Sequence, residues 1–135
     1  MKFEKAKNLN YLLDILDLRN QKYVRKNSFN FNIIKSIQTH KLWFCNYIKK
    51  NKLYILKKRG RFVGYIRINT KNKNVSWAIY KEFWGKLDFY KTLKKLTKKN
   101  HIAKIKNINQ NSIIVAIKAG FVITSVNNGI IKLKK

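Results

Sequence analysis

The sequence predicts a mixed α/β domain of the α+β kind, in which a mainly antiparallel sheet of six or seven strands is flanked by about four helices. The first reason is residues 75–96, where a run rich in β-branched and aromatic residues passes through a tight turn into apolar residues at helical spacing. The second is a series of short strand-like runs, separated by turn residues, on both sides of that segment. The third is a chain of 135 residues, 45% of them hydrophobic, with no internal repeat and no linker-like segment. These features predict one domain over residues 1–135.

The N-terminal third of the chain predicts one strand and two helices. A short strand is expected over residues 1–6 and a helix over residues 12–20, where Leu and Ile recur at helical spacing. A polar segment dotted with aromatic residues follows. Asn32 is expected to cap a second helix over residues 33–48, because an Asn side chain accepts a hydrogen bond from the first helical turn.

The middle of the chain predicts an antiparallel meander of three strands, over residues 52–58, 61–70 and 75–80. Arg59 and Gly60 separate the first two strands and form the kind of two-residue turn that joins hairpin strands.

The last part of the chain predicts a helix, a strand, another helix and a hairpin. The helix over residues 86–99 would be a right-handed crossover, so the strands before and after it should be adjacent and parallel. The second of these strands is expected over residues 102–108. The next helix should be capped by Asn109 or Asn111 and closed by Gly120 in the left-handed conformation. An Asn-Asn-Gly turn predicts the terminal hairpin.

The formal net charge of +27 is carried almost entirely by lysine, since only five of the 32 basic residues are arginine. Lysine spread along the whole chain, with abundant Asn and Ile, favours a compositional bias, so nucleic acid is not expected as the partner. The chain has no apolar run long enough to span a bilayer and no recognisable secretion signal, and its single Cys45 excludes an internal disulfide. We therefore expect a cytoplasmic protein without a metal site.

The turn within residues 75–96 is the first candidate site. A strand, a short turn and a helix in this order direct the free N–H groups of the first helical turn toward an anion such as a phosphate, and the helix dipole favours that charge.

A second candidate site follows the strand over residues 102–108. Asn109 and Ser112 stand in an N-x-x-S pattern, and Lys118 belongs to a K-x-G-F ending. With the order of elements over nearly the whole chain, these residues resemble the GNAT family of acyl-CoA-dependent N-acetyltransferases. The resemblance implies acetyl-CoA as cosubstrate and a primary amine as acceptor. In the family, the central strand pairs with the pantetheine arm and the following turn binds the pyrophosphate. The implied cofactor-binding residues are Trp77, Ala78, Ile79, Gly85, Lys86, Asn109 and Ser112.

The N-terminal pattern RN…VR..SF…H..WF looks like the branch of the family that acetylates amino sugars on nucleotide carriers, as in pseudaminic acid synthesis. The resemblance implies an acceptor site formed by Arg19, Asn20, Arg25, Ser28, His40 and Trp43. Arg25 is the expected phosphate contact, because a guanidinium offers paired donors. Packing roles stay open: Arg19 and Asn20 also fit a helix end, and His40 and Trp43 also fit a core-facing helix surface.

The sequence departs from the family pattern at two places. In the phosphate turn, Trp84 replaces a basic or amide residue, and Leu87 and Phe89 replace small residues, while Asp88 adds a negative charge. These residues are expected to weaken binding of acetyl-CoA. Ala116 stands where the family often has a Tyr that protonates the leaving thiolate.

The remaining titratable candidates near the implied site are Glu82, Tyr80, His40 and Tyr90, and the sequence favours none of them as the catalytic residue. Two functions therefore compete. One is an N-acetyltransferase for a small amine, most readily an amino sugar nucleotide. The other is an impaired or repurposed domain of the same fold that binds a ligand or partner without acetyl transfer. Either would be a monomer or a homodimer.

Overall fold

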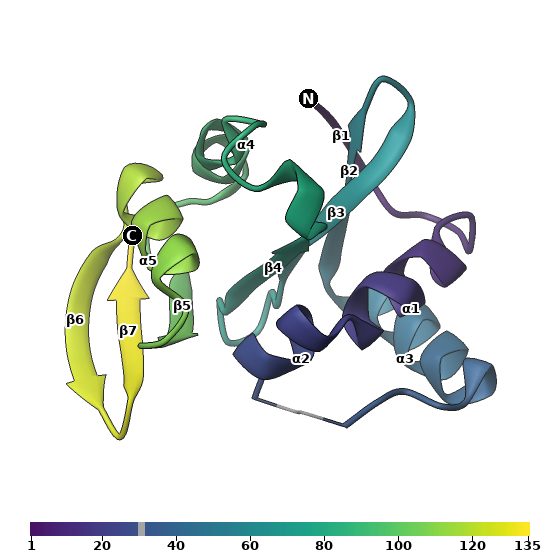
Figure 1. Ribbon diagram of the computed structural model, residues 1–135, viewed down its shortest axis with the longest axis horizontal. Helices are drawn as coiled ribbons and strands as arrows, with labels where there is room; N and C mark the ends of the chain where they lie inside the picture. The colour runs from purple at the N-terminus through teal and green to yellow at the C-terminus, as the bar shows by residue number, and fades with distance from the viewer. Residues whose placement is uncertain (30–31) are drawn as a thin grey trace.

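The computed structural model describes residues 1–29 and 32–135 (Figure 1). In chain order its elements are β1 (Lys2–Lys5), α1 (Leu12–Asn20), α2 (Lys22–Asn27), α3 (Ile37–Lys50), β2 (Lys52–Lys58), β3 (Arg61–Ile68), β4 (Val75–Ile79), the 3-10 helix η1 (Lys81–Phe83), α4 (Phe89–Leu96), β5 (Ile102–Lys106), α5 (Gln110–Lys118), β6 (Val122–Asn127) and β7 (Ile130–Lys134). The predicted α+β class is confirmed, with seven strands and five α-helices in the described residues. None of the helices in this part of the chain is long and apolar enough to cross a membrane.

The N-terminal sheet has the strand order β1-β2-β3-β4, with every neighbouring pair antiparallel. The predicted meander is therefore confirmed. Its first turn has both central residues in the left-handed region, with φ of 51° at Arg59 and 78° at Gly60. This conformation matches the right-handed twist of the two strands it joins.

The C-terminal sheet has the order β5-β7-β6, again antiparallel, so the last strand lies in the middle. Asn128 and Gly129 make the predicted hairpin turn, with φ of 52° and 74°. The side chain of Lys135 ties this sheet to α4, because its Nζ donates to the carbonyl oxygen of Lys94 at 2.9 Å and to Thr97 Oγ1 at 2.9 Å.

The two sheets meet where β4 and β5 begin. A parallel bridge joins Asn74 and Ile102, and the N–H of Ile102 donates to the carbonyl oxygen of Lys73 at 2.9 Å. Beyond this point β4 and β5 belong to separate sheets, and Figure 1 shows them apart. The predicted parallel neighbours are confirmed, and their divergence splits the expected sheet into four and three strands.

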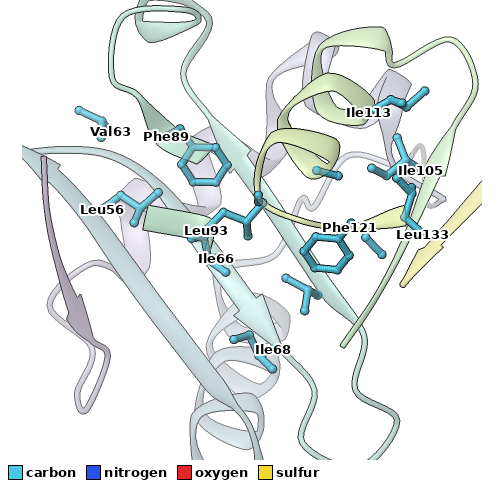
Figure 2. Packing of buried hydrophobic residues seen from close by; sticks show 14 residues of the cluster. Leu56, Val63, Ile66, Ile68, Phe89, Leu93, Ile105, Ile113, Phe121 and Leu133 are labelled. Carbon is cyan, nitrogen blue, oxygen red and sulfur yellow. The ribbon is translucent and has the colours of Figure 1, made fainter. Parts of the chain in front are cut away.

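Two hydrophobic clusters lie on opposite faces of the N-terminal sheet. The helices α1 and α3 cover one face, where Leu18 and Phe44 pack on Ile55. On the other face, α4, α5 and the C-terminal sheet share one core, in which Phe89 and Phe121 are buried (Figure 2). Because one core joins both sheets, packing on this core holds β4 and β5 in their diverging arrangement.

The predicted helix over residues 33–48 is wrong at its start. The helix α3 begins at Ile37, and the hydroxyl of Ser36 caps it by accepting from the N–H of Thr39 at 3.2 Å. Asn32 does not cap it, because the intervening backbone is bound elsewhere: the N–H of Ile34 donates to Asn20 Oδ1 at 2.8 Å. The extra helix, α2, lies in the segment that the sequence indicates only as polar.

Candidate functional site

A cavity of about 740 Å³ lies where β4 and β5 diverge. Its wall is formed by α1, α2, β3, β4, the turn after η1, the start of α4, β5 and one side of α5. A space of this size is typical of a small-molecule site at a topological junction of the sheet.

Most of the residues predicted for the cofactor lie in this wall. The six that line the cavity are Trp77, Ala78, Ile79, Gly85, Asn109 and Ser112, whereas Lys86 does not. The predicted acceptor residues divide differently. Arg19 and Ser28 line the cavity, and Asn20, Arg25, His40 and Trp43 lie outside its lining.

The strand β4 offers a free backbone edge to the cavity. Tyr80 donates its N–H to Val63 of β3 at 3.0 Å. Because hydrogen bonding alternates along an antiparallel pair, the backbone groups of Trp77 and Ile79 face away from β3, toward β5. The side chains alternate as well, with Trp77 packed on the core beneath α4 and Ala78 on the core beneath α1.

The turn after η1 carries a row of free N–H donors. Gly85 has φ of 74° and Asp88 has φ of 48°, so the chain enters α4 through two left-handed residues. Within residues 1–29 and 32–135, the N–H groups of Gly85, Leu87, Asp88, Phe89 and Tyr90 donate to no protein acceptor. Successive free donors at a helix N-terminus form an anion-binding site.

The side chains that depart from the GNAT pattern of the phosphate turn make contacts within the protein. Phe89 is 7% exposed and its ring centroid lies 6.0 Å from that of Trp77, while Leu87 packs against the same core. Trp84 donates its indole N–H to the carbonyl oxygen of Ile79 at 3.0 Å and meets the Tyr23 ring edge-on at 5.4 Å. Trp84 thus occupies one backbone acceptor on the free edge of β4.

The N-x-x-S pattern has a structural role in addition to its place in the wall. Asn109 Oδ1 accepts from the N–H of Ser112 at 3.4 Å and caps α5, as predicted. The predicted left-handed end of this helix is also confirmed, since Gly120 has φ of 101°. Ala116 is completely buried in the core, so this position supplies packing and no acid.

The catalytic candidates from the sequence lie mostly outside the cavity. Tyr90 lines it, with Lys118 Nζ 5.6 Å from its ring, whereas Glu82, Tyr80 and His40 do not. The phenol of Tyr80 donates to the Asp17 carboxylate, and burial, reinforced by this carboxylate, raises the pKa of Tyr80 well above its usual range.

His40 is a buried link between helices, with 1% of its surface exposed. Burial lowers the pKa of His40, so the ring is neutral at pH 7. Its Nε2–H donates to the carbonyl oxygen of Leu12 at 2.9 Å, which leaves Nδ1 to accept from Arg19 Nη1 at 3.4 Å. His40 therefore positions Arg19 and has no path to a ligand of its own.

Asn20 and Arg25 also hold the backbone in place. The Asn20 amide binds both backbone groups of Ile34, since its Nδ2 donates to the carbonyl oxygen at 3.0 Å and its Oδ1 accepts from the N–H. Arg25 Nε donates to the Asn20 carbonyl oxygen at 3.1 Å. These bonds attach α2 and the segment before α3 to the end of α1.

The sequence interpretation missed two residues of β3, Tyr65 and Arg67, both of which line the cavity. Arg67 Nε donates to Ser76 Oγ on β4 at 3.0 Å, and its guanidinium lies 5.6 Å from the Trp43 ring. Strand alternation was the available signal, because it places Tyr65 and Arg67 on the same face.

No metal-ion site accompanies the cavity in the described part of the chain, where no three His, Cys, Asp or Glu side chains lie close together.

Comparison by sequence finds no family model and no curated protein that matches the chain. Comparison by structure finds the same fold in several acetyltransferases. A ribosomal-protein-alanine N-acetyltransferase from Brucella melitensis is 15% identical, with a TM-score of 0.75, over 100% of this chain and 99% of that one. A spermidine N-acetyltransferase from Vibrio cholerae, solved with CoA and spermine, is 13% identical, with a TM-score of 0.78, over 98% and 92%. A GNAT superfamily phosphinothricin acetyltransferase from Sinorhizobium meliloti, solved with acetyl-CoA, is 16% identical, with a TM-score of 0.75, over 99% and 86%.

Proposed function

We propose that this chain, which has the fold of the GNAT acetyltransferases, transfers an acetyl group from acetyl-CoA to a primary amine. The observation that carries the proposal is the cavity in which the free edge of β4 runs toward the row of free N–H donors after η1. A thioester with an amide-containing arm and a pyrophosphate needs both features, side by side and in this order.

The residues present fit the two parts of acetyl-CoA. The pantetheine arm would pair with the backbone of Trp77 on the free edge of β4, while the pyrophosphate would accept from the N–H groups of Gly85, Leu87 and Phe89. Lys104 and Lys118, which also line the cavity, add positive charge on its β5 and α5 side.

The reaction needs little from the protein beyond this geometry. The neutral amine attacks the thioester carbonyl, a C–N bond forms, the C–S bond breaks, and the amine proton is lost while the thiolate gains one. Holding amine and thioester in contact supplies much of the rate. Among the wall residues, Tyr65 and Tyr90 carry phenols that are able to donate a proton to the thiolate.

The acceptor is proposed to be an amino sugar on a nucleotide carrier. The support is the resemblance of residues 19–44 to that branch, together with Arg19 and Ser28 in the wall of the cavity. The spermidine and phosphinothricin enzymes of the same fold act on other amines, so the acceptor must be tested directly.

A second function, binding without acetyl transfer, is favoured by two observations. Trp84 already occupies the carbonyl oxygen of Ile79, and Ala116 offers no acid at the position where the family often has one. A domain with these changes would keep the cavity and lose the chemistry.

Calorimetry with acetyl-CoA, followed by an assay of released thiol with a panel of amines, separates the two functions. Cys45 adds a constant background of one thiol per chain, so the assay should use Cys45→Ala. Binding with amine-dependent thiol release is the expected result. Binding without release supports the second function, and the absence of binding contradicts the proposed one.

A further inference from the structure

Two arginine side chains from different elements lie together in the acceptor part of the cavity. Arg19 comes from α1 and Arg67 from β3, and both line the cavity. The Cζ atom of Arg19 lies 4.0 Å from the centroid of the Trp43 ring, and that of Arg67 lies 5.6 Å from the same centroid. Because both Cζ atoms lie close to the same ring centroid, the two guanidinium groups are near each other in the cavity wall, where one ligand would be able to contact both.

No carboxylate neutralises this pair of charges. The ion pairs of the described residues join Lys57 to Glu4 and Lys91 to Asp88, and neither involves Arg19 or Arg67. Burial lowers the pKa of Arg19, an effect that Tyr65 opposes and the nearby charge of Arg67 reinforces. Two partly buried like charges without a counter-ion are unfavourable, so an anion between them would be stabilised.

Both guanidinium groups keep donors available. Arg67 uses Nε for Ser76 Oγ at 3.0 Å, and Arg19 uses Nη1 for His40 Nδ1 at 3.4 Å. The two Nη groups of Arg67, and Nε and Nη2 of Arg19, have no hydrogen-bond partner among residues 1–29 and 32–135. The planar fork of an arginine matches the oxygens of a phosphate or carboxylate, which it binds in pairs.

We propose that Arg19 and Arg67 bind an oxyanion group of the acceptor, a phosphate or a carboxylate, so that the protein selects anionic amines over neutral amines and polyamines. The inference rests on the proposed function insofar as the bound amine is the one acetylated. The anion is thereby assigned to Arg19 and Arg67 and not to Arg25, the residue that the sequence suggested. Arg25 lies outside the cavity lining, and its Nε donates to the backbone carbonyl of Asn20.

The arginine side chains provide a direct readout, because the chain has only five. Nitrogen-15 spectra of the Arg Nε–H groups should be followed while glucosamine 6-phosphate or glucosamine is added. The phosphorylated sugar is expected to shift the signals of Arg19 and Arg67 and to leave those of the exposed Arg59 and Arg61 in place. Glucosamine should shift neither pair. Equal shifts on all of the arginines would overturn the proposal and indicate a diffuse effect of the net charge of +27.

A matched pair of variants tests the energy of the contact. Arg67→Gln and Arg59→Gln remove the same charge, one inside the cavity and one on an exposed turn. Calorimetry should show glucosamine 6-phosphate binding roughly 10- to 150-fold more weakly to Arg67→Gln, which is the loss of a charged hydrogen bond. Arg59→Gln should bind as the parent does. If Arg67→Gln fails to fold, Arg67→Lys keeps the charge without the fork and should still weaken binding. Equal affinity of the folded Arg67 variant and the Arg59 control would overturn the proposal.

The source of the oxyanion is settled by a second pair of probes, γ-aminobutyrate and butylamine. A preference for γ-aminobutyrate that disappears in Arg67→Gln assigns the site to a carboxylate, and the same result with the sugar pair assigns it to a phosphate. These binding measurements are independent of acetyl transfer. Arg67-dependent binding without transfer would contradict the proposed function and support the anion site. Transfer to glucosamine and to its phosphate at equal rates would support the proposed function and contradict the anion site.

Discussion

The two ends of the cavity present hydrogen-bond donors of different kinds, and each is proposed to bind an anion. At the turn end, the donors are backbone N–H groups between Gly85 and Tyr90, and two residues of this segment are left-handed, while the side chains of Leu87 and Phe89 pack into the core. At the acceptor end, the donors are the side chains of Arg19 and Arg67, whose Cζ atoms both lie close to the Trp43 ring, while Arg67 is also held by Ser76. Binding through backbone N–H groups should tolerate side-chain substitutions and should be lost when the backbone conformation changes. Binding through the two arginine side chains should be lost when either side chain is replaced.

The largest expected effect tests whether the Phe89 side chain at the turn end packs in the core and does not stand over the ligand site. Phe89→Ala should reduce the free energy of unfolding by about 3–5 kcal/mol, because this ring is buried in the core shared by the two sheets. Leu42→Ala is the matched control, since Leu42 is 67% exposed and should change stability by less than about 0.5 kcal/mol. Urea denaturation measures both. A loss below about 1 kcal/mol for Phe89→Ala would show that the ring stands over the turn instead of in the core.

The next variant tests whether the turn acts through its backbone. Gly85→Val places a β-branched residue at a φ of 74°, although its Cβ would meet nothing within 4 Å. The cost of that conformation, about 1–3 kcal/mol, should shift the turn and weaken acetyl-CoA binding roughly 5- to 150-fold. Calorimetry is the measurement. Leu87→Ala changes a side chain and keeps the N–H, so its binding of acetyl-CoA should stay within a few-fold of the parent; a larger loss would mean that the side chains recognise the ligand.

The acceptor end is expected to respond to pH through His40. Its pKa is lowered in the folded protein by burial, so the unfolded chain binds the proton first as the pH falls. Stability present above about pH 6.5 should therefore be lost below that value, with a slope of up to about 1.4 kcal/mol per pH unit. The pKa of His101 is also lowered, so the measurement should use His101→Gln as the parent. Adding His40→Gln should remove the remaining slope, and a slope that persists would place the titrating group elsewhere.

The smallest expected effect concerns the one side chain that restricts the free edge of β4. Trp84→Phe keeps an aromatic ring against Tyr23 and removes the N–H that donates to the carbonyl oxygen of Ile79. Freeing this acceptor should strengthen acetyl-CoA binding about two- to tenfold, the value of one hydrogen bond. Weaker binding would instead show that the indole contacts the ligand.

The sequence predicted the parts of the molecule that depend on local signals. The turns at Arg59-Gly60 and Asn128-Gly129 and the Asn109 cap each need only adjacent residues, and each is confirmed. The start of α3 was predicted wrongly because its competitor, Asn20, lies 14 residues from Ile34 in the chain.

The candidate site shows the same division. Except for Lys86, the predicted residues of β4, the turn after it and the start of α5 line the cavity, because each group is contiguous in the chain. A helix-face pattern places His40 and Trp43 on the same side and does not say whether that side meets a ligand or a core. Arg67 meets Trp43 across 24 positions of sequence, which no local pattern records.

The place of β7 between β5 and β6 has a consequence for how the molecule is made. A ribosome releases β5 and then β6 before their common partner. While the nascent chain is still short of Ile130, β6 has no strand to pair with, and β5 has only its bridge to the start of β4 at Ile102. The N-terminal sheet, by contrast, is complete once β4 has emerged. During synthesis the first four strands are therefore able to fold as a unit. The part of the cavity wall carried by β5 and α5 is completed only when β7 pairs between β5 and β6.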